Sequence, residues 1–304
     1  MNRIPSWRTE RGFSFVVSLF FIVLLMTIAG GLAYRVRAEA SAMNNFKDET
    51  QAYYLAVAGL NRAIAEISGD FALVVGAEDG SALFAVKNDE GYSILRAERE
   101  FALGDGTVSY SIEDERGKIN LNTAKRETLF ELMRLLSVDG ADSGTIADAI
   151  IDWRDEDHDP GLEGAEDDYY SSVNSPYGAK DDSFDSTGEA ALVKGMTKEV
   201  FHGTDDTPGA RAFLTAYGDG KVNINTADEK VLVAALGAGT AAEILSRRGT
   251  GFFERPVHGG EVTSGVFSIT SRGTVRGLEV ALSAIVEKRG DRAVVRYFNT
   301  GRRS

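Results

Sequence analysis

The chain has 304 residues, of which 43% are hydrophobic, enough for an anchor plus one large domain or two ordinary ones. Its formal net charge of -13 repels nucleic-acid phosphates, so we expect no nucleic-acid partner. Cysteine is absent from the sequence, which excludes disulfides, thiolate metal sites and cysteine nucleophiles.

An uncharged apolar segment occupies residues 13–34. As a helix it would span roughly 33 Å, which matches the core of a bilayer. Arg3, Arg8 and Arg11 precede the segment, and the positive-inside rule keeps them in the cytoplasm. The sequence therefore predicts a single-pass protein of the inner membrane whose soluble part lies in the periplasm.

The junction Arg11-Gly12-Phe13 resembles the processing site of type IV pilins and type II secretion pseudopilins. The resemblance implies that residues 1–12 are a prepilin leader, that a prepilin peptidase cuts after Gly12, and that Phe13 becomes the methylated first residue. An ordinary uncleaved anchor is the alternative interpretation.

These families usually carry a glutamate at the fifth residue after the cut, where this chain has Val17. In a filament that glutamate is buried in an apolar helix bundle and pairs with the terminal amine of a neighbouring subunit. A subunit at the tip has no neighbour above it. The absence of the glutamate therefore favours a cap.

Helical periodicity continues beyond Tyr34 without a proline, so residues 35–117 are predicted to hold the rest of a long helix and the first strands. Alternation predicts strands over 92–98 and 108–113, joined as a hairpin through the turn at 104–106. Residues 259–304 contain three more strand-like stretches, at 266–272, 278–287 and 293–298.

Residues 118–258 have a different, mainly helical composition and contain a repeat. The sequence GKINLNTA at 117–124 recurs as GKVNINTA at 220–227, and each copy precedes a helical pattern. The Asn and Thr side chains suit a helix start. The repeats resemble helix-hairpin-helix modules, which often bind DNA, but an acidic chain outside the cytoplasm favours a structural role.

Residues 152–189 hold thirteen acidic side chains against Arg154 and Lys180, a balance of -11 in a chain of -13. Such crowding is unfavourable unless cations neutralise part of it. Aspartates alternate along 155–159 as oxygen ligands of a hard cation do, and Gly161 and Gly164 allow the chain to turn back. We predict a structural calcium ion, and a solvated acidic loop is the alternative. The candidate ligands are Asp155, Asp157, Asp159, Glu163, Glu166, Asp167, Asp168 and Glu189.

Residues suited to catalysis are few. The sequence has three histidines, no G-x-S-x-G elbow and no Gly-rich phosphate loop. His158 lies among the carboxylates, but a single histidine there indicates a hydrated loop residue rather than a transition-metal ligand. We therefore expect no enzymatic activity, with a membrane-anchored calcium-dependent hydrolase as an alternative.

Several features coincide: the Arg-Gly-Phe junction, Val17, the helix ending YYLAVAGLNRAI, the GKINLNTA element, and IIDWRDEDHDPGLEGAEDDYY followed by EAALVKGM. Together, and over most of the chain, they resemble the minor pseudopilin K family of type II secretion systems. The resemblance implies an α+β fold in which a pilin-like long N-terminal helix packs on an antiparallel sheet. It also implies a large, mainly helical domain inserted between the strands and containing bound calcium.

The resemblance further implies a place at the pseudopilus tip with minor pseudopilins I and J. There the family caps the filament and helps to initiate its assembly for the export of folded proteins across the outer membrane. Exoprotein substrates and the outer-membrane secretin are further candidate partners. A minor pilin of a type IV pilus-like system shares the junction but seldom the acidic insertion, and it is a second alternative. Relatives with a disulfide in this region differ from this chain, so calcium is expected to matter more to its stability.

Overall fold

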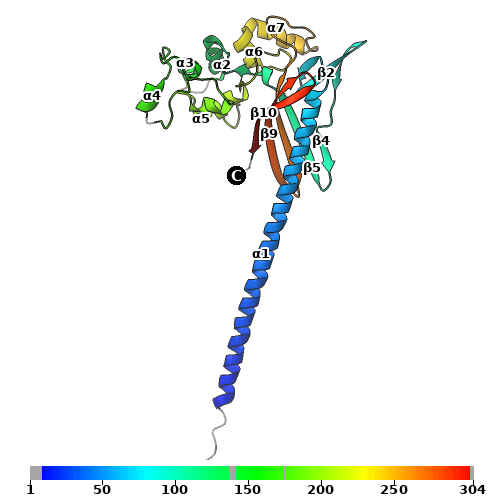
Figure 1. Ribbon diagram of the computed structural model, residues 1–304, viewed down its shortest axis with the longest axis vertical. Coiled ribbons are helices and arrows are strands. Elements are labelled where there is room, and N and C mark those ends of the chain that lie inside the picture. Colours follow the sequence, from blue (N-terminus) through cyan, green and yellow to red (C-terminus); the bar gives the residue numbers. More distant parts are fainter. Residues whose placement is uncertain (1–8, 137–141, 174, 302–304) are drawn as a thin grey trace, which may run out of the picture.

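The computed structural model describes residues 9–136, 142–173 and 175–301. One long helix, α1 (Thr9–Ser68), runs from the N-terminal side into the folded body of the molecule (Figure 1). The predicted span at 13–34 lies on the part of α1 that projects from this body, and its side chains are exposed. Among the described residues, α1 is the helix long and apolar enough to cross a membrane.

The predicted processing site lies near the start of α1. Gly12 and Phe13 both fall inside the helix, and the Phe13 side chain is 74% exposed. Residues 1–8 of the predicted leader lie outside the described residues. Cleavage after Gly12 therefore stays a prediction.

The second half of α1 packs on a five-stranded sheet with the order β10-β9-β8-β5-β4. All four strand pairs of this sheet are antiparallel. The three strands expected near the C-terminus are present, each longer than its alternation indicated. The strands are β4 (Glu100–Leu103), β5 (Gly106–Asp114), β8 (Val266–Val275), β9 (Leu278–Arg289) and β10 (Arg292–Gly301).

Small residues bring α1 close to this sheet. Ala52 and Ala56 are fully buried on the helix, and the Oγ of Ser271 on β8 donates a hydrogen bond of 2.7 Å to the Ala56 carbonyl. A Cβ on Gly273 would overlap the Ala52 carbonyl, so this strand position requires glycine. The predicted α+β arrangement of a long helix on an antiparallel sheet is confirmed.

One prediction about the strands is wrong. Residues 108–113 lie in β5, but the hairpin partner of β5 is β4, not the stretch at 92–98. That stretch contributes β3 (Gly91–Leu95) to a separate sheet, in which β2 (Ala82–Asn88) pairs with both β1 (Leu73–Gly76) and β3. Alternation has the same period in every strand, so it does not tell which of two candidates forms the hairpin.

The small sheet joins two hydrophobic cores. Val74 and Phe84 belong to the core between α1 and the five-stranded sheet. Leu73, Val75 and Ala85 belong instead to the core of the helical insertion, because successive residues of a strand point to opposite faces. The small sheet therefore lies between two cores: that of the insertion, and that of α1 with the five-stranded sheet, which together we call the α1 unit.

The chain between β5 and β8 forms the mainly helical insertion, called the insert below (residues 115–265). Figure 1 shows the insert at the end of the molecule away from the start of α1. Its helices are α2 (Arg126–Leu136), α3 (Ser143–Arg154), α4 (Asp167–Ser172), α5 (Lys198–His202), α6 (Glu229–Leu236) and α7 (Ala238–Arg248). Two short strands, β6 (Ile119–Asn120) and β7 (Leu214–Thr215), pair in parallel.

The two repeat copies make matching contacts in the insert. Asn122 donates to and accepts from the backbone of Phe184, at 3.0 and 2.7 Å. Asn225 makes the same pair of bonds with Phe253, at 2.9 and 2.8 Å. These amides hold distant loops to the repeats, which is a structural use of the conspicuous asparagines. The assignment to helix-hairpin-helix modules stays a prediction.

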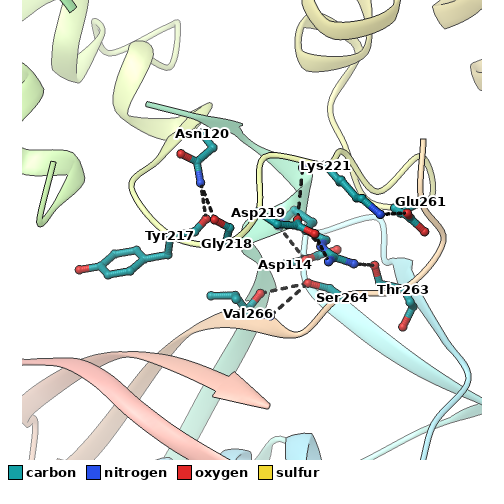
Figure 2. Close-up of polar contacts among 11 residues, drawn as sticks. Asp114, Asn120, Tyr217, Gly218, Asp219, Lys221, Glu261, Thr263, Ser264 and Val266 are labelled. Atoms are coloured by element: carbon teal, nitrogen blue, oxygen red, sulfur yellow. Dashed lines mark hydrogen bonds and ion pairs between the residues drawn. The ribbon is translucent and has the colours of Figure 1, made fainter. Parts of the chain in front are cut away.

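A polar junction ties the insert to the strand that precedes it (Figure 2). Arg116, just after β5, holds both carboxylate oxygens of Asp219, at 3.1 and 2.7 Å, and donates to the Thr263 carbonyl at 3.1 Å. Lys221 and Glu261 form an ion pair of 2.7 Å nearby. Arg116 thus links the outgoing and returning segments of the insert.

Candidate metal centre

The acidic segment that follows α3 folds back onto the end of that helix. The buried Asp152 carboxylate accepts the backbone N–H groups of Gly161 and Ala165, at 3.1 and 2.6 Å. A Cβ on Gly164 would overlap the same carboxylate, so the return of the chain requires glycine here. Asp152 therefore holds the loop at 155–166 against the end of α3.

Two groups of side chains in this loop and the next form a candidate metal centre. Carboxylate oxygens of Asp155, Asp157 and Glu166 lie within 4.8 Å of one another. Ligand atoms of His158, Glu166 and Asp181 lie within the same distance of one another. Glu166 belongs to both groups, so we call these five residues the Glu166 cluster.

Several buried oxygens of the Glu166 cluster are unpaired. Glu166 is 5% exposed, and neither of its carboxylate oxygens has a hydrogen-bond partner among the described residues. One buried oxygen each of Asp155 and Asp181 also lacks a partner within the part of the chain that the structure describes. Buried polar atoms without partners are unfavourable. Buried carboxylate oxygens without hydrogen-bond partners suit the binding of a cation.

The electrostatics of the cluster agree with its geometry. Burial, together with the carboxylates of Asp152, Asp181 and Asp155, raises the pKa of Glu166 to about 7. Burial and the neighbouring charges of Asp157 and Asp152 also raise the pKa of Asp155. Like charges crowded in a poorly solvated place shift pKa values in this direction. A cation would reverse the effect by favouring the ionised carboxylates.

The donor set fits a hard cation. Four of the five side chains offer carboxylate oxygens, which are preferred ligands of calcium. The remaining one, His158, has a side chain that is 74% exposed, and its Nδ1 lies 3.4 Å from Asp181. One exposed imidazole is a weak basis for a transition-metal site. Calcium is therefore the ion that suits these residues.

The structure brings together only some of the predicted ligands. Asp155, Asp157 and Glu166 meet in the cluster. Two others have different contacts: Asp167 accepts the Ala179 N–H at 3.0 Å, and Glu189 forms a capping box at the start of a 3-10 turn. The predicted ligands outside the cluster are Asp159, Glu163, Asp167, Asp168 and Glu189.

Sequence reasoning did not select Asp181, which approaches the cluster from the following loop. Its backbone has a φ of 53°, a left-handed conformation that aspartate tolerates better than most residues. The adjacent acidic residues Asp181 and Asp182 were the feature of the sequence that could have indicated this further ligand. Its distance to Glu166, however, depends on how two loops are packed.

Aromatic side chains anchor these loops to the core of the insert. Trp153 stacks on Phe184 and meets Tyr170 edge-on, with ring centroids 6.3 and 5.7 Å apart. Trp153 and Tyr170 are 3% and 2% exposed. The loops that carry the Glu166 cluster are therefore held to the core by buried aromatic side chains.

Comparisons with known proteins find a family model and several proteins that this chain resembles. A family model described as type II secretion system (T2SS), protein K, matches residues 110–204, which include the Glu166 cluster. The chain is similar to type II secretion system protein K of Pseudomonas aeruginosa, with 27% identity over 261 residues, 81% of this chain and 75% of that protein. It is also similar to the Aeromonas hydrophila protein K, with 24% identity over 65% of this chain and 62% of that protein.

A solved structure resembles the fold. The chain is similar to the crystal structure of the GspK-GspI-GspJ complex from the type 2 secretion system of enterotoxigenic Escherichia coli, with a TM-score of 0.57 and 18% identity. The match covers 88% of this chain and 100% of that chain. At this identity the likeness concerns the fold.

Proposed function

We propose that this chain, a minor pseudopilin of the type II secretion system protein K family, caps the tip of the pseudopilus and helps to initiate its assembly. The alternatives, a minor pilin of a type IV pilus-like system and a membrane-anchored hydrolase, are not favoured by these relatives. The observation that carries the proposal is the position of the insert. It lies at the end of the molecule away from the start of α1, where a subunit stacked above would meet it (Figure 1).

The membrane-embedded half of α1 supports the same position. Val17 is apolar where a filament subunit would carry a glutamate to pair with its neighbour. A tip subunit lacks that neighbour and would keep a charge unpaired in an apolar bundle. The three arginines before the apolar segment favour a cytoplasmic leader, so we place the body and its insert in the periplasm.

For partners, we extend to this chain the assembly seen in the similar structure, in which GspK is bound to GspI and GspJ. We assign it pseudopilins I and J as neighbours and a structural rather than catalytic role. His158 and His258 lie beside different carboxylates, Asp181 and Glu243, which are far apart in the sequence. The His258 pair is an exposed surface contact, and the His158 pair belongs to the Glu166 cluster.

A single label tests the tip position. The chain has no cysteine, so Ala242→Cys on the exposed side of α7 gives a unique attachment point for gold. We expect gold at one end of isolated pseudopili. Gold spaced along the length of the pseudopili would contradict capping. Pseudopili without gold, isolated from a strain that still secretes, would show that the chain is not part of the tip.

We also propose that the Glu166 cluster binds calcium as a structural ion. Asp155, Asp157, Glu166 and Asp181 would hold it, while Asp152 orients the loop beneath. When bound, calcium supplies positive charge to carboxylates that otherwise repel one another. The support is the set of buried oxygens that lack partners in the described chain. Thermal unfolding of the full chain in detergent, with excess calcium and then with chelator, tests the proposal.

A further inference from the structure

The two edges of the five-stranded sheet differ in a way that the fold alone does not require. β4 (Glu100–Leu103) ends the sheet on one side with four residues, begins with the charged Glu100, and is followed in the turn by the charged Asp105. β10 (Arg292–Gly301) ends it on the other side with ten residues and contains no proline. Natural proteins keep free sheet edges short and charged because a long apolar edge pairs with other strands.

The β10 edge is apolar as well as long. Val294, Val295, Tyr297 and Phe298 are between 39% and 45% exposed. By the register with β9, Val295 and Phe298 pair with Val286 and Ala284, two residues buried under α1. Val295 and Phe298 therefore extend the face of the sheet on which α1 lies, whereas Val294 and Tyr297 pair with Glu287 and Ile285 and point to the other face.

This edge is continuous with the exposed surface of α1. Phe46 and Tyr54 of α1 line a groove together with Thr300 and Gly301 of β10. Phe46 and Tyr54 are 71% and 65% exposed. Exposed apolar side chains thus lie on both sides of this groove, which Glu49, Thr50 and Glu279 also line.

The local charge is opposite to that of the whole chain. Residues 287–296 contain Lys288, Arg289, Arg292 and Arg296 but only two acidic residues, whereas the chain carries -13. Glu287 is shared by two of these cations, Arg289 and Arg296, at 3.1 and 2.6 Å. A partner with acidic side chains would complement this edge.

We propose that the outer edge of β10 pairs with an extended, acidic segment of a neighbouring pseudopilin, which adds a strand to the sheet while its helix packs against α1. The inference rests on the proposed function. A pseudopilin suits the surface because it offers a helix for the exposed side of α1 and a strand for the edge of β10. A cleft of about 730 Å³ lies between the insert and the middle of β10, lined by Tyr217 and Arg296.

Amide exchange on the full chain in detergent tests the pairing directly. When pseudopilins I and J are added, we expect exchange over 292–301 to slow by about tenfold or more, because the edge N–H groups gain partners. Exchange over 100–103 on the opposite edge should change by less than about twofold.

Charge variants give a second, independent readout. Phe298→Glu places a carboxylate on an edge that would face acidic side chains, and we expect affinity for the partners to fall by about tenfold. Leu103→Glu on β4 is the matched control, because Leu103 and Phe298 are 46% and 45% exposed. The control should bind within about twofold of the unsubstituted chain. Thermal unfolding verifies that both variants fold.

The outcomes separate this inference from the proposed function. If the chain binds pseudopilins I and J while β10 exchanges as fast as before, the inference is wrong and the proposed function stands. If neither partner binds, both are wrong. Protection of β10 by a second copy of this chain alone, or only by an exported protein, would assign the edge to another occupant and overturn the proposal.

Discussion

The α1 unit and the insert achieve their stability by different means. In the α1 unit, Phe84, Ile112 and Phe267 are fully buried and most backbone groups are paired within the helix and the sheet ladders. In the insert, long loops lack such ladders, and side chains such as Asn225 and Asp152 pair with their backbone groups instead. The comparison shows that periodic apolar burial and ladder hydrogen bonds dominate in the first region, whereas the second depends more on individual polar residues.

The largest expected effect tests whether the two regions are coupled. Phe84 lies in the small sheet shared by both cores and stacks on Phe71 with centroids 4.4 Å apart. Phe84→Ala should lower the free energy of unfolding by about 3–5 kcal/mol because it leaves a cavity. Denaturant unfolding followed by Trp153 fluorescence reports on the insert. If the denaturant midpoint followed by Trp153 fluorescence is unchanged, the two regions unfold independently. Phe298→Ala, at an exposed position, is the control.

The next effect concerns the asparagine side chains that hydrogen-bond to loops of the insert. Asn225 is 2% exposed, and its removal would leave the buried N–H and carbonyl of Phe253 without these partners. Asn225→Ala should lower the free energy of unfolding by about 3 kcal/mol. The exposed Asn299 provides a matched substitution, Asn299→Ala, which should change it by less than about 0.5 kcal/mol. Equal effects of the two variants in denaturant titrations would remove the distinction between the regions.

Calcium should stabilise the insert more than the α1 unit. At a calcium concentration about 100 times the Kd, the ion should add about 2.7 kcal/mol to the free energy of unfolding. Glu166→Gln should abolish this gain, while in calcium-free buffer it should be neutral or stabilising because it removes a crowded charge. Asp168→Asn, outside the cluster, should keep the calcium response in differential scanning calorimetry. An unsubstituted chain with equal melting temperatures in calcium and in chelator would contradict the metal centre.

The smallest effect is the pH dependence of the calcium-free chain. The pKa of Glu166 is raised to about 7 from 4.5, so its protonated form is favoured by folding. The associated stability should be fully present below about pH 4.5 and should decrease as the pH rises through about 7. Denaturant midpoints between pH 5 and 8 measure this slope, and Glu166→Gln should flatten it. A slope that Glu166→Gln leaves unchanged would assign the titration to other groups.

The regions also differ in how well the sequence predicted them. The long helix, the three C-terminal strands and α6 follow from periodicity, since a helix or strand repeats its burial every few residues. The pairing of β4 with β5 and the existence of β1 and β2 did not follow from periodicity, because short strands of the same period compete for one partner.

By itself the sequence determined the apolar segment of α1, the class of fold, the repeat and the concentration of negative charge in one segment, because composition and periodicity are local properties. Tertiary structure alone decided which carboxylates meet. It joined Glu166 to Asp181 from another loop and assigned Glu189 to a helical cap. The physical reason is that a metal centre is set by distances of a few ångströms between loops, and loop packing depends on buried contacts that spacing in the sequence does not record.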